Sequence, residues 1–224
     1  MKLVVGLGNP GSQYDGTRHN VGAEVVELLA REANARLTEK KWRGRVGRGS
    51  VAGEDCILLM PQTYMNLSGE SVGPCFGFYR LSTDDVVVIH DDIDLELGRL
   101  KLKQGGGHGG HNGLRSLDAN LPDNNYFRVR IGVGRPPPGW DPASWVLSRF
   151  GQDERSIADK SVSRAADAVR DLFTLGLTKA SAQHNRSADE AERRPKKPKR
   201  ESSSEAESNR SDDATDDGRE WKTE

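Results

Sequence analysis

Hydrophobic and polar positions along the first 180 residues follow two periods, one typical of strands and one typical of helices. Short continuous apolar runs bounded by glycine, proline or acidic residues indicate buried strands; these are KLVVGL (2–7), CILLM (56–60) and VVVIH (86–90). The segments RLKLK (99–103) and YFRVRIGVG (126–134) alternate instead between apolar and charged residues, which predicts strands that face the core on one side.

Apolar residues at helical spacing lie between and after these strands. The spacing predicts helices over 21–35, 66–81, 112–121 and 153–177, with Pro74 able to kink the second. The apolar positions expected to face inward are Val21, Val25, Leu28 and Leu29 in the first helix, and Ile157, Ala165, Ala168, Val169 and Leu172 in the last. Alternating strands and helices predict an α/β fold. We expect a single-domain three-layer sandwich, with helices on both faces of a twisted, mostly parallel mixed sheet.

The composition changes sharply near residue 185. Residues 185–224 contain no Leu, Ile, Val, Phe, Met or Tyr, and 22 of these 40 residues are charged, 10 basic and 12 acidic. Such a segment cannot bury enough apolar surface to offset the entropy lost on ordering. We therefore expect a folded domain over 1–184 and a charged, disordered tail over 185–224. The basic stretch RRPKKPKR (193–200) makes the tail either a solubilising extension or an arm that attracts RNA.

Several classes of protein are disfavoured by the remaining composition. The chain has only two cysteines, without paired spacing, which suits a reducing compartment. No run reaches the roughly 18 apolar residues of a membrane span, and the N-terminal apolar run is too short for a signal peptide. A soluble, cytoplasmic protein is expected. The motifs HExxH and CxxC are absent, and GESVG (69–73) lies within the predicted helix over 66–81 rather than at the strand-to-helix turn of a nucleophile elbow, so covalent and metal-dependent hydrolysis are poorly supported.

Unusual polar residues follow the predicted strands at their carboxyl ends. Asn9 and His19 come after the first strand, Met65 and Asn66 after the second, and Asp91 at the end of the third. Ligands of open α/β sheets bind beyond the carboxyl ends of the strands. If the strands are parallel neighbours, these side chains meet at one edge of the sheet.

Each of these residues also has a purely structural explanation. Asn9 lies in GNPG, which is good turn chemistry, and His19 could cap the helix that starts near residue 20. HDDID (90–94) resembles a carboxylate metal site, but solvated loop charges explain it equally well. His108 and His111 could bind a metal, although QGGGHGGHNG (104–113) is too rich in glycine for a preformed cage.

One histidine, one carboxylate and several asparagines suit general-base activation of water. His19 would deprotonate the water, and Asp91 would orient the ring and favour its charged form. Asparagine amides could position the water and donate to a developing oxyanion. An ester suits such a site better than an amide, because an alkoxide leaves more readily.

Basic residues cluster on two of the alternating strands. Lys101 and Lys103 share one side of their strand, and Arg128 and Arg130 share one side of theirs. They form either a solvated strand face or a surface that follows phosphates, as RNA with a single-stranded end would require.

Five motifs together resemble the bacterial-type peptidyl-tRNA hydrolase family. They are GLGNPGSQYDGTRHNVG (6–22), PQTYMNLSG (61–69), HDDIDLELG (90–98), KLKQGGGHGGHNGL (101–114) and RVRIGVGRP (128–136). The resemblance implies a monomeric α/β hydrolase without cofactor or metal. It would cleave the ester between a peptide and the 3′ ribose of tRNA and so recycle prematurely released peptidyl-tRNA.

The resemblance also implies a role for each matching residue. His19 matches the catalytic base, Asp91 the carboxylate that supports it, and Asn9 and Asn66 the asparagines that bind the peptide end and the water. The remaining matches are Tyr14 where the tRNA end enters, Met65 as a wall of the cleft, Asn112 as the asparagine that gates it, and Lys101, Lys103 and Arg130 as contacts for tRNA phosphates.

Other functions remain open at this point. GLGNPG (6–11) favours a nucleotide-binding module without catalysis, but it lacks the third glycine and the phosphate-binding lysine of known motifs. Basic strands alone would also permit a non-catalytic RNA-binding protein. An amide-cleaving peptidase would usually need a metal or a nucleophile that the sequence does not display.

Overall fold

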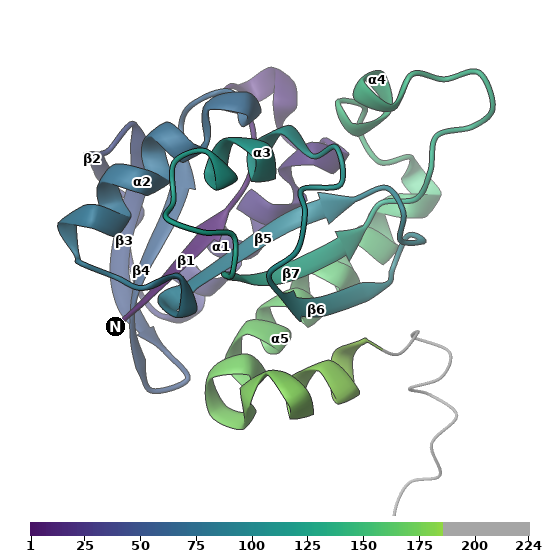
Figure 1. The fold of residues 1–224 in the computed structure, drawn as a ribbon. Coiled ribbons are helices and arrows are strands. Elements are labelled where there is room, and N and C mark those ends of the chain that lie inside the picture. Colours follow the sequence, from purple (N-terminus) through teal and green to yellow (C-terminus); the bar gives the residue numbers. More distant parts are fainter. Residues whose placement is uncertain (186–224) are drawn as a thin grey trace, which may run out of the picture. The chain divides into compact units, whose positions relative to one another are not determined.

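The computed structural model describes residues 1–185, which form a seven-stranded mixed sheet in the order β2-β3-β4-β1-β5-β7-β6 (Figure 1). The four inner strands run parallel to one another: β4 (Glu54–Pro61), β1 (Lys2–Gly6), β5 (Val86–Asp92) and β7 (Phe127–Gly132). The outer strands pair antiparallel: β2 (Glu39–Lys41) and β3 (Gly44–Val51) at one edge, and β6 (Leu100–Gln104) at the other. The predicted α/β class and mixed sheet are confirmed.

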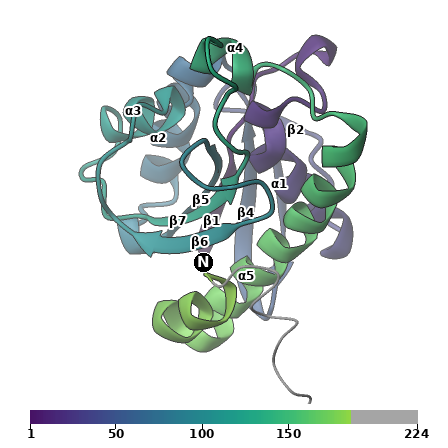
Figure 2. The ribbon, with the colours of Figure 1, turned by 90° about the vertical axis from the view of Figure 1, so that its right-hand side faces the viewer.

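Helices cover both faces of this sheet, as Figure 2 shows. The helices α1 (Val21–Glu32) and α5 (Gln152–His184) pack on one face, and α2 (Gly69–Phe78) and α3 (Asn112–Asp118) on the other. A short helix, α4 (Pro142–Val146), and the 3₁₀ turns η1 (Ser12–Tyr14), η2 (Arg18–Asn20), η3 (Met65–Leu67) and η4 (Thr83–Asp85) complete the described chain.

The inner strands are apolar throughout because both of their faces are buried. Along β1, Val4 points toward the core under α1 and α5, whereas Leu3 and Val5 point toward the core under α2 and α3. The same alternation places Val87 and Ile89 on the first face and Val86 and Val88 on the second. Strands buried on both sides read as continuous apolar runs, which is why the sequence reveals them.

The structure corrects the predicted elements in several places. The strands β2 and β3 were not predicted, because exposed charged positions and three glycines interrupt the apolar pattern there. The last helix continues past residue 177 to His184, through Gly176 with a non-helical φ of 75°. The inward orientation expected of Ile157 is wrong, because its side chain is 41% exposed and meets the loop at Gly98 rather than the sheet.

The other predicted helices are shorter than expected, with α1 ending at Glu32 and α3 at Asp118. The predicted helix over 66–81 divides into η3 and α2, and α2 contains Pro74. Nothing between residues 1 and 185 forms a helix long and apolar enough to cross a membrane.

Asn185 ends the described chain at the exposed edge of the sheet. Its Oδ1 accepts from the Leu102 N–H at 2.7 Å, and its Nδ2 donates to the Leu102 carbonyl at 3.3 Å. The Asn185 side chain thus bonds to the N–H and the carbonyl of Leu102, two groups on the edge strand β6 that could otherwise pair with another strand. The predicted tail beyond this residue lies outside the described residues.

Candidate active site

The carboxyl ends of the inner strands open into one cleft of about 880 Å³. Asn9 and His19 follow β1, Met65 and Asn66 follow β4, and Asp91 lies near the end of β5. The predicted site residues that line the cleft are Asn9, Tyr14, His19, Met65, Asn66, Asp91, Lys103, Asn112 and Arg130. Lys101 is exposed and does not line it. The predicted convergence of these strand ends is therefore present in the fold.

A glycine brings the two central side chains within reach of each other. Gly22, in the first turn of α1, lies so close to β5 that a Cβ there would be 2.3 Å from the Ile89 carbonyl oxygen. No other residue permits this approach. Because His19 precedes α1 and Asp91 follows Ile89, the close packing sets the distance between the imidazole and the carboxylate.

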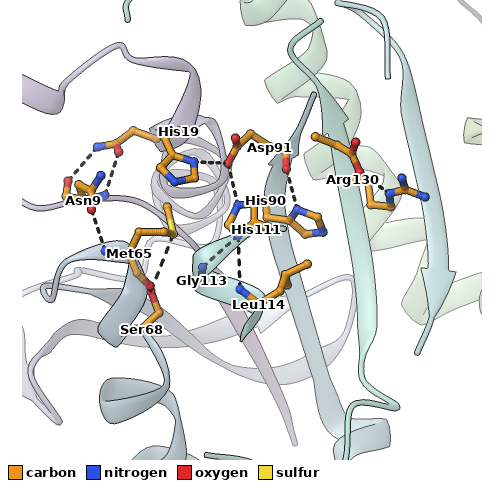
Figure 3. A network of polar contacts seen from close by, with 12 residues as sticks. Asn9, His19, Met65, Ser68, His90, Asp91, His111, Gly113, Leu114 and Arg130 are labelled. Carbon is orange, nitrogen blue, oxygen red and sulfur yellow. Dashed lines mark hydrogen bonds and ion pairs between the residues drawn. The ribbon is translucent and has the colours of Figure 1, made fainter. Parts of the chain in front are cut away.

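Asp91 holds two histidines through one oxygen (Figure 3). Its Oδ1 lies 2.8 Å from Nδ1 of His19 and 2.9 Å from Nε2 of His111. The carboxylate is 2% exposed and His19 is 8% exposed, so water screens these contacts little. The His19 and His111 ring centroids lie 5.0 Å apart.

The hydrogen bonds assign the protons on both rings. Nδ1 of His111 lies 3.1 Å and 3.3 Å from the backbone nitrogens of Gly113 and Leu114, so it accepts from these N–H groups and caps α3. His111 must then carry its proton on Nε2 and donate it to Asp91. His19 donates through Nδ1, which leaves its Nε2 as the nitrogen able to take a proton.

His19, Asp91 and His111 could also suggest a metal site, because their ligand atoms lie within 4.8 Å of one another. The cap on α3 argues against this interpretation. A neutral imidazole that binds a metal through Nε2 carries its proton on Nδ1, and in His111 that nitrogen already accepts two backbone N–H groups. The three residues fit a hydrogen-bonded triad better than a metal centre.

The contact between His19 and Asp91 shifts their two pKa values in opposite directions. Burial alone would lower the pKa of His19, but the charge of Asp91 and its hydrogen bond outweigh burial and raise this pKa above its ordinary value. Burial alone would raise the pKa of the Asp91 carboxyl, but the two imidazoles hold it well below its usual range. Asp91 is therefore ionised at neutral pH and favours the protonated form of His19.

Asn9 is fixed in one amide orientation by the backbone of η3. Its Oδ1 accepts from the Met65 N–H at 2.7 Å, which leaves its Nδ2 available as a donor. The backbone of Asn9 is held in turn by Asn20, whose Oδ1 accepts from the Asn9 N–H at 2.8 Å and whose Nδ2 donates to its carbonyl at 2.9 Å. The two asparagines thus position a donor beside the imidazole.

Asn112, at the start of α3, is exposed and also lines the cleft. Its Oδ1 accepts from Nη1 of Arg115 at 3.1 Å, so its amide nitrogen is also free to donate. The adjacent Gly113 lets α3 approach the cleft wall, because a Cβ there would lie 2.6 Å from the Met65 sulfur. Asn66 and Tyr14 also line the cleft, and within residues 1–185 their side chains make no hydrogen bond of this kind.

Lys103 and Arg130 bring positive charge to one side of the cleft. In the register of β6 and β7, Lys101 lies opposite Arg130 and Lys103 opposite Arg128. Burial and the neighbouring Arg128, Arg130 and Lys101 lower the pKa of Lys103. Arg130 is partly balanced by Asp92, whose Oδ2 accepts from its Nε at 2.6 Å. Like charges placed opposite each other are unfavourable and are typical of a surface that binds anions.

Arg128 differs from the other basic residues of these strands. Its side chain is 2% exposed and donates to the carbonyls of Gly106 and Gly107, the latter at 2.8 Å. It does not belong to a solvated strand face, one of the two alternatives that the alternating pattern left open. Instead, it fixes the glycine-rich loop 104–113 to the sheet.

Comparison with known proteins agrees with this geometry. The family model "Peptidyl-tRNA hydrolase" matches residues 3–193. The chain belongs to the peptidyl-tRNA hydrolase family. It is 50% identical over 192 residues to the peptidyl-tRNA hydrolase of Anaeromyxobacter dehalogenans, covering 86% of this chain and 100% of that protein. The Geobacter sulfurreducens peptidyl-tRNA hydrolase is 48% identical over 184 residues, covering 82% and 95%.

Solved structures place the fold in the same family. The crystal structure of the Acinetobacter baumannii peptidyl-tRNA hydrolase has a TM-score of 0.78 and 40% identity to this chain, covering 84% of it and 95% of that protein. The family resemblance inferred from the five motifs is confirmed.

Sequence reasoning missed several residues that shape this peptidyl-tRNA hydrolase site. Asn20 lies within the motif at 6–22 and was given no role, although its side chain holds the backbone of Asn9. His90 is buried, and its Nδ1 donates to the Asp91 carbonyl at 2.7 Å. Burial and the nearby His111 lower the pKa of His90 well below its ordinary value, so it packs as a neutral ring. His111 both donates to Asp91 and caps α3.

Proposed function

We propose that this protein hydrolyses the ester between a peptide and the 3′-terminal ribose of tRNA, and so recycles tRNA from prematurely released peptidyl-tRNA. The observation that carries the proposal is the His19 imidazole, held by Asp91 at 2.8 Å in a cleft that also contains several amide donors. Membership of the family supports the choice of substrate, because relatives about half identical to this chain are named peptidyl-tRNA hydrolases.

His19 is the general base of the proposed reaction. Its free Nε2 takes a proton from a water molecule as the water oxygen attacks the ester carbonyl. Asp91 holds the ring through Nδ1 and stabilises the imidazolium that forms. The imidazolium then returns the proton to the 3′ oxygen of the ribose as the carbon–oxygen bond breaks.

The asparagines stabilise the charge that develops on the carbonyl oxygen. Asn9 offers its fixed Nδ2, and Asn112 offers an amide nitrogen from the start of α3. Asn66 positions the water, Met65 forms the wall beside it, and Tyr14 lies where the 3′ end enters the cleft. Preorganised donors of this kind need no rearrangement as the oxyanion forms.

The tRNA phosphates bind to the basic face of β6 and β7. Lys103 and Arg130 lie at the cleft, and Lys101 extends the charge beyond it. The lowered pKa of Lys103 supports this assignment, because it reflects burial first and then the positive charges of Arg128, Arg130 and Lys101, which an anion would offset. We further propose that the protein acts as a cytoplasmic monomer without a metal or cofactor.

The decisive experiment follows the hydrolysis of a labelled N-acyl-aminoacyl-tRNA in the presence of a chelator. Intact tRNA and free N-acyl amino acid are the expected products, and an analogue joined through a 3′ amide should resist cleavage. The variant His19→Ala should lose about 10²- to 10⁴-fold in turnover, the typical contribution of a general base.

His184→Ala is the matched control, because His184 pairs with Asp171 outside the cleft. It should retain the turnover of the unmodified protein. Full activity in His19→Ala, or loss of activity on chelation, would contradict the proposed mechanism.

A further inference from the structure

We propose that Arg18 is a positioning residue that holds one wall of the cleft against the turn that carries His19. This wall, here called the α4 wall, consists of Ala143, Val146 and Leu147, which line the cleft from α4 and the residue after it. The effect on activity rests on the proposed function, whereas the effect on the mobility of the wall does not.

The backbone joins the two segments directly. The Arg18 N–H donates to the Ser148 carbonyl at 3.0 Å, and Thr17 forms an antiparallel bridge with Arg149. The start of η2 and the segment after α4 are therefore joined by one isolated β-bridge. These residues are 130 positions apart in sequence, so no local pattern indicates their contact.

The Arg18 side chain reinforces this pairing from within. It is 2% exposed, and its Nη1 donates to Ser148 Oγ at 2.9 Å while its Nη2 donates to Glu154 Oε2 at 2.6 Å. Within residues 1–185, every side-chain hydrogen bond of Arg18 goes to residues 148–154. A buried guanidinium is unfavourable unless it is paired and hydrogen-bonded, and here its partners all belong to the segment that follows α4.

Trp145 completes the attachment. The guanidinium carbon of Arg18 lies 3.6 Å from the centroid of the indole ring, a close cation–π contact. The ring is also held by its Nε1–H, which donates to the Gly134 carbonyl at 2.8 Å. Because a helix of five residues is unstable alone, α4 depends on such tertiary contacts for its position.

Displacing the α4 wall should affect catalysis differently from replacing a residue of the triad. His19 is oriented by Asp91 on β5, and this hydrogen bond does not involve the α4 wall. The wall presents apolar side chains to the substrate in both the ground state and the transition state. Contacts of this kind contribute uniform binding, whose loss raises KM and leaves kcat unchanged.

The test compares Arg18→Lys with the unmodified protein, using N-acyl-aminoacyl-tRNA as the substrate. Lysine keeps the charge but cannot donate in several directions from one plane. We expect KM to rise about tenfold, equivalent to about 1.4 kcal/mol, with kcat within about twofold and an unchanged acidic limb of the pH profile. Amide hydrogen exchange over residues 141–150 should become faster.

Trp145→Leu provides an independent variant if Arg18→Lys fails to fold. It should show the same KM increase, and the double variant should not exceed the larger single effect, because both residues act through one contact. Arg164→Lys is the matched control, since Arg164 is also partly buried but donates to the Gly98 carbonyl away from the cleft. This control should leave KM unchanged.

Three results would overturn the proposal: an unchanged KM, a fall in kcat with a shifted acidic limb, or unchanged hydrogen exchange over 141–150. The second would mean that Arg18 acts through His19 rather than through the wall. If the unmodified protein did not cleave peptidyl-tRNA, the proposed function would fail, while hydrogen exchange in Arg18→Lys would still decide whether Arg18 holds the wall.

Discussion

Replacing Asp91 by asparagine removes the negative charge of the carboxylate but keeps the size of the side chain. The amide has nearly the same size, and its oxygen can still accept from Nδ1 of His19 and Nε2 of His111, which lie 2.8 Å and 2.9 Å from the carboxylate oxygen. What the substitution removes is the negative charge. Any loss of activity therefore measures the electrostatic support of the His19 imidazolium.

The expected loss follows from the distance and the burial of the pair. Two unit charges about 4 Å apart interact by about 4 kcal/mol at an effective dielectric constant near 20. The amide oxygen retains roughly half of the hydrogen-bond strength of the carboxylate. A net loss of about 3–4 kcal/mol of transition-state stabilisation corresponds to a decrease of about 10²- to 10³-fold in kcat.

The pH profile should change in a definite direction. In the unmodified protein the pKa of His19 is raised above 6.5, so activity falls as pH drops through that raised value and the base becomes protonated. In Asp91→Asn only burial remains, and burial lowers the pKa of an imidazole. The acidic limb should therefore move to lower pH even though the rate on the plateau is smaller.

Steady-state hydrolysis of N-acyl-aminoacyl-tRNA between about pH 5 and 9 measures the loss in kcat and the position of the acidic limb. The pH profile of kcat/KM gives the limb, because it reports the titrating groups of the free enzyme. Asp55→Asn is a matched control, since that exposed carboxylate pairs with Arg48 outside the cleft. A kcat within about tenfold of the unmodified protein, or a limb displaced to higher pH, would refute the reasoning.

Two further substitutions test other parts of the site. His111→Ala removes the cap of α3 and should lower the free energy of unfolding by about 0.5–2 kcal/mol, measured by denaturant titration. It should also move the acidic limb to higher pH, because Asp91 then supports His19 alone; a shift to lower pH would contradict this. Lys103→Ala should reduce the slope of log affinity for tRNA against log salt by about 1, whereas Lys179→Ala, on an exposed part of α5, should not. Equal slopes for both variants would argue against a phosphate contact at Lys103.

The inner sheet and the site were predictable for the same physical reason. Parallel strands buried on both faces require continuous apolar runs, and their carboxyl ends must share one edge. The polar residues that follow those runs, such as His19 and Asp91, were therefore expected to meet without knowledge of any contact. Their hydrogen bond at 2.8 Å agrees with that expectation. Their catalytic roles remain predictions.

What the sequence left undetermined depends on contacts between distant segments. Period two places Arg128 and Arg130 on the same side of β7, yet only Arg128 is covered by the glycine-rich loop and buried. Arg18 is adjacent to His19 in the chain but bonds to residues 148–154. Ile157 was misplaced because helical spacing gives a face of α5 but not where the core beneath that face ends.

The cap of α3 has a consequence for the whole triad. Two backbone N–H groups donate to Nδ1 of His111, so this ring offers the proton on Nε2 to Asp91. His19 donates to the same carboxylate oxygen through Nδ1, which leaves its Nε2 as the nitrogen able to take a proton. The glycine that lets α3 pack against Met65 thus helps to hold His111 in the orientation in which it donates to Asp91.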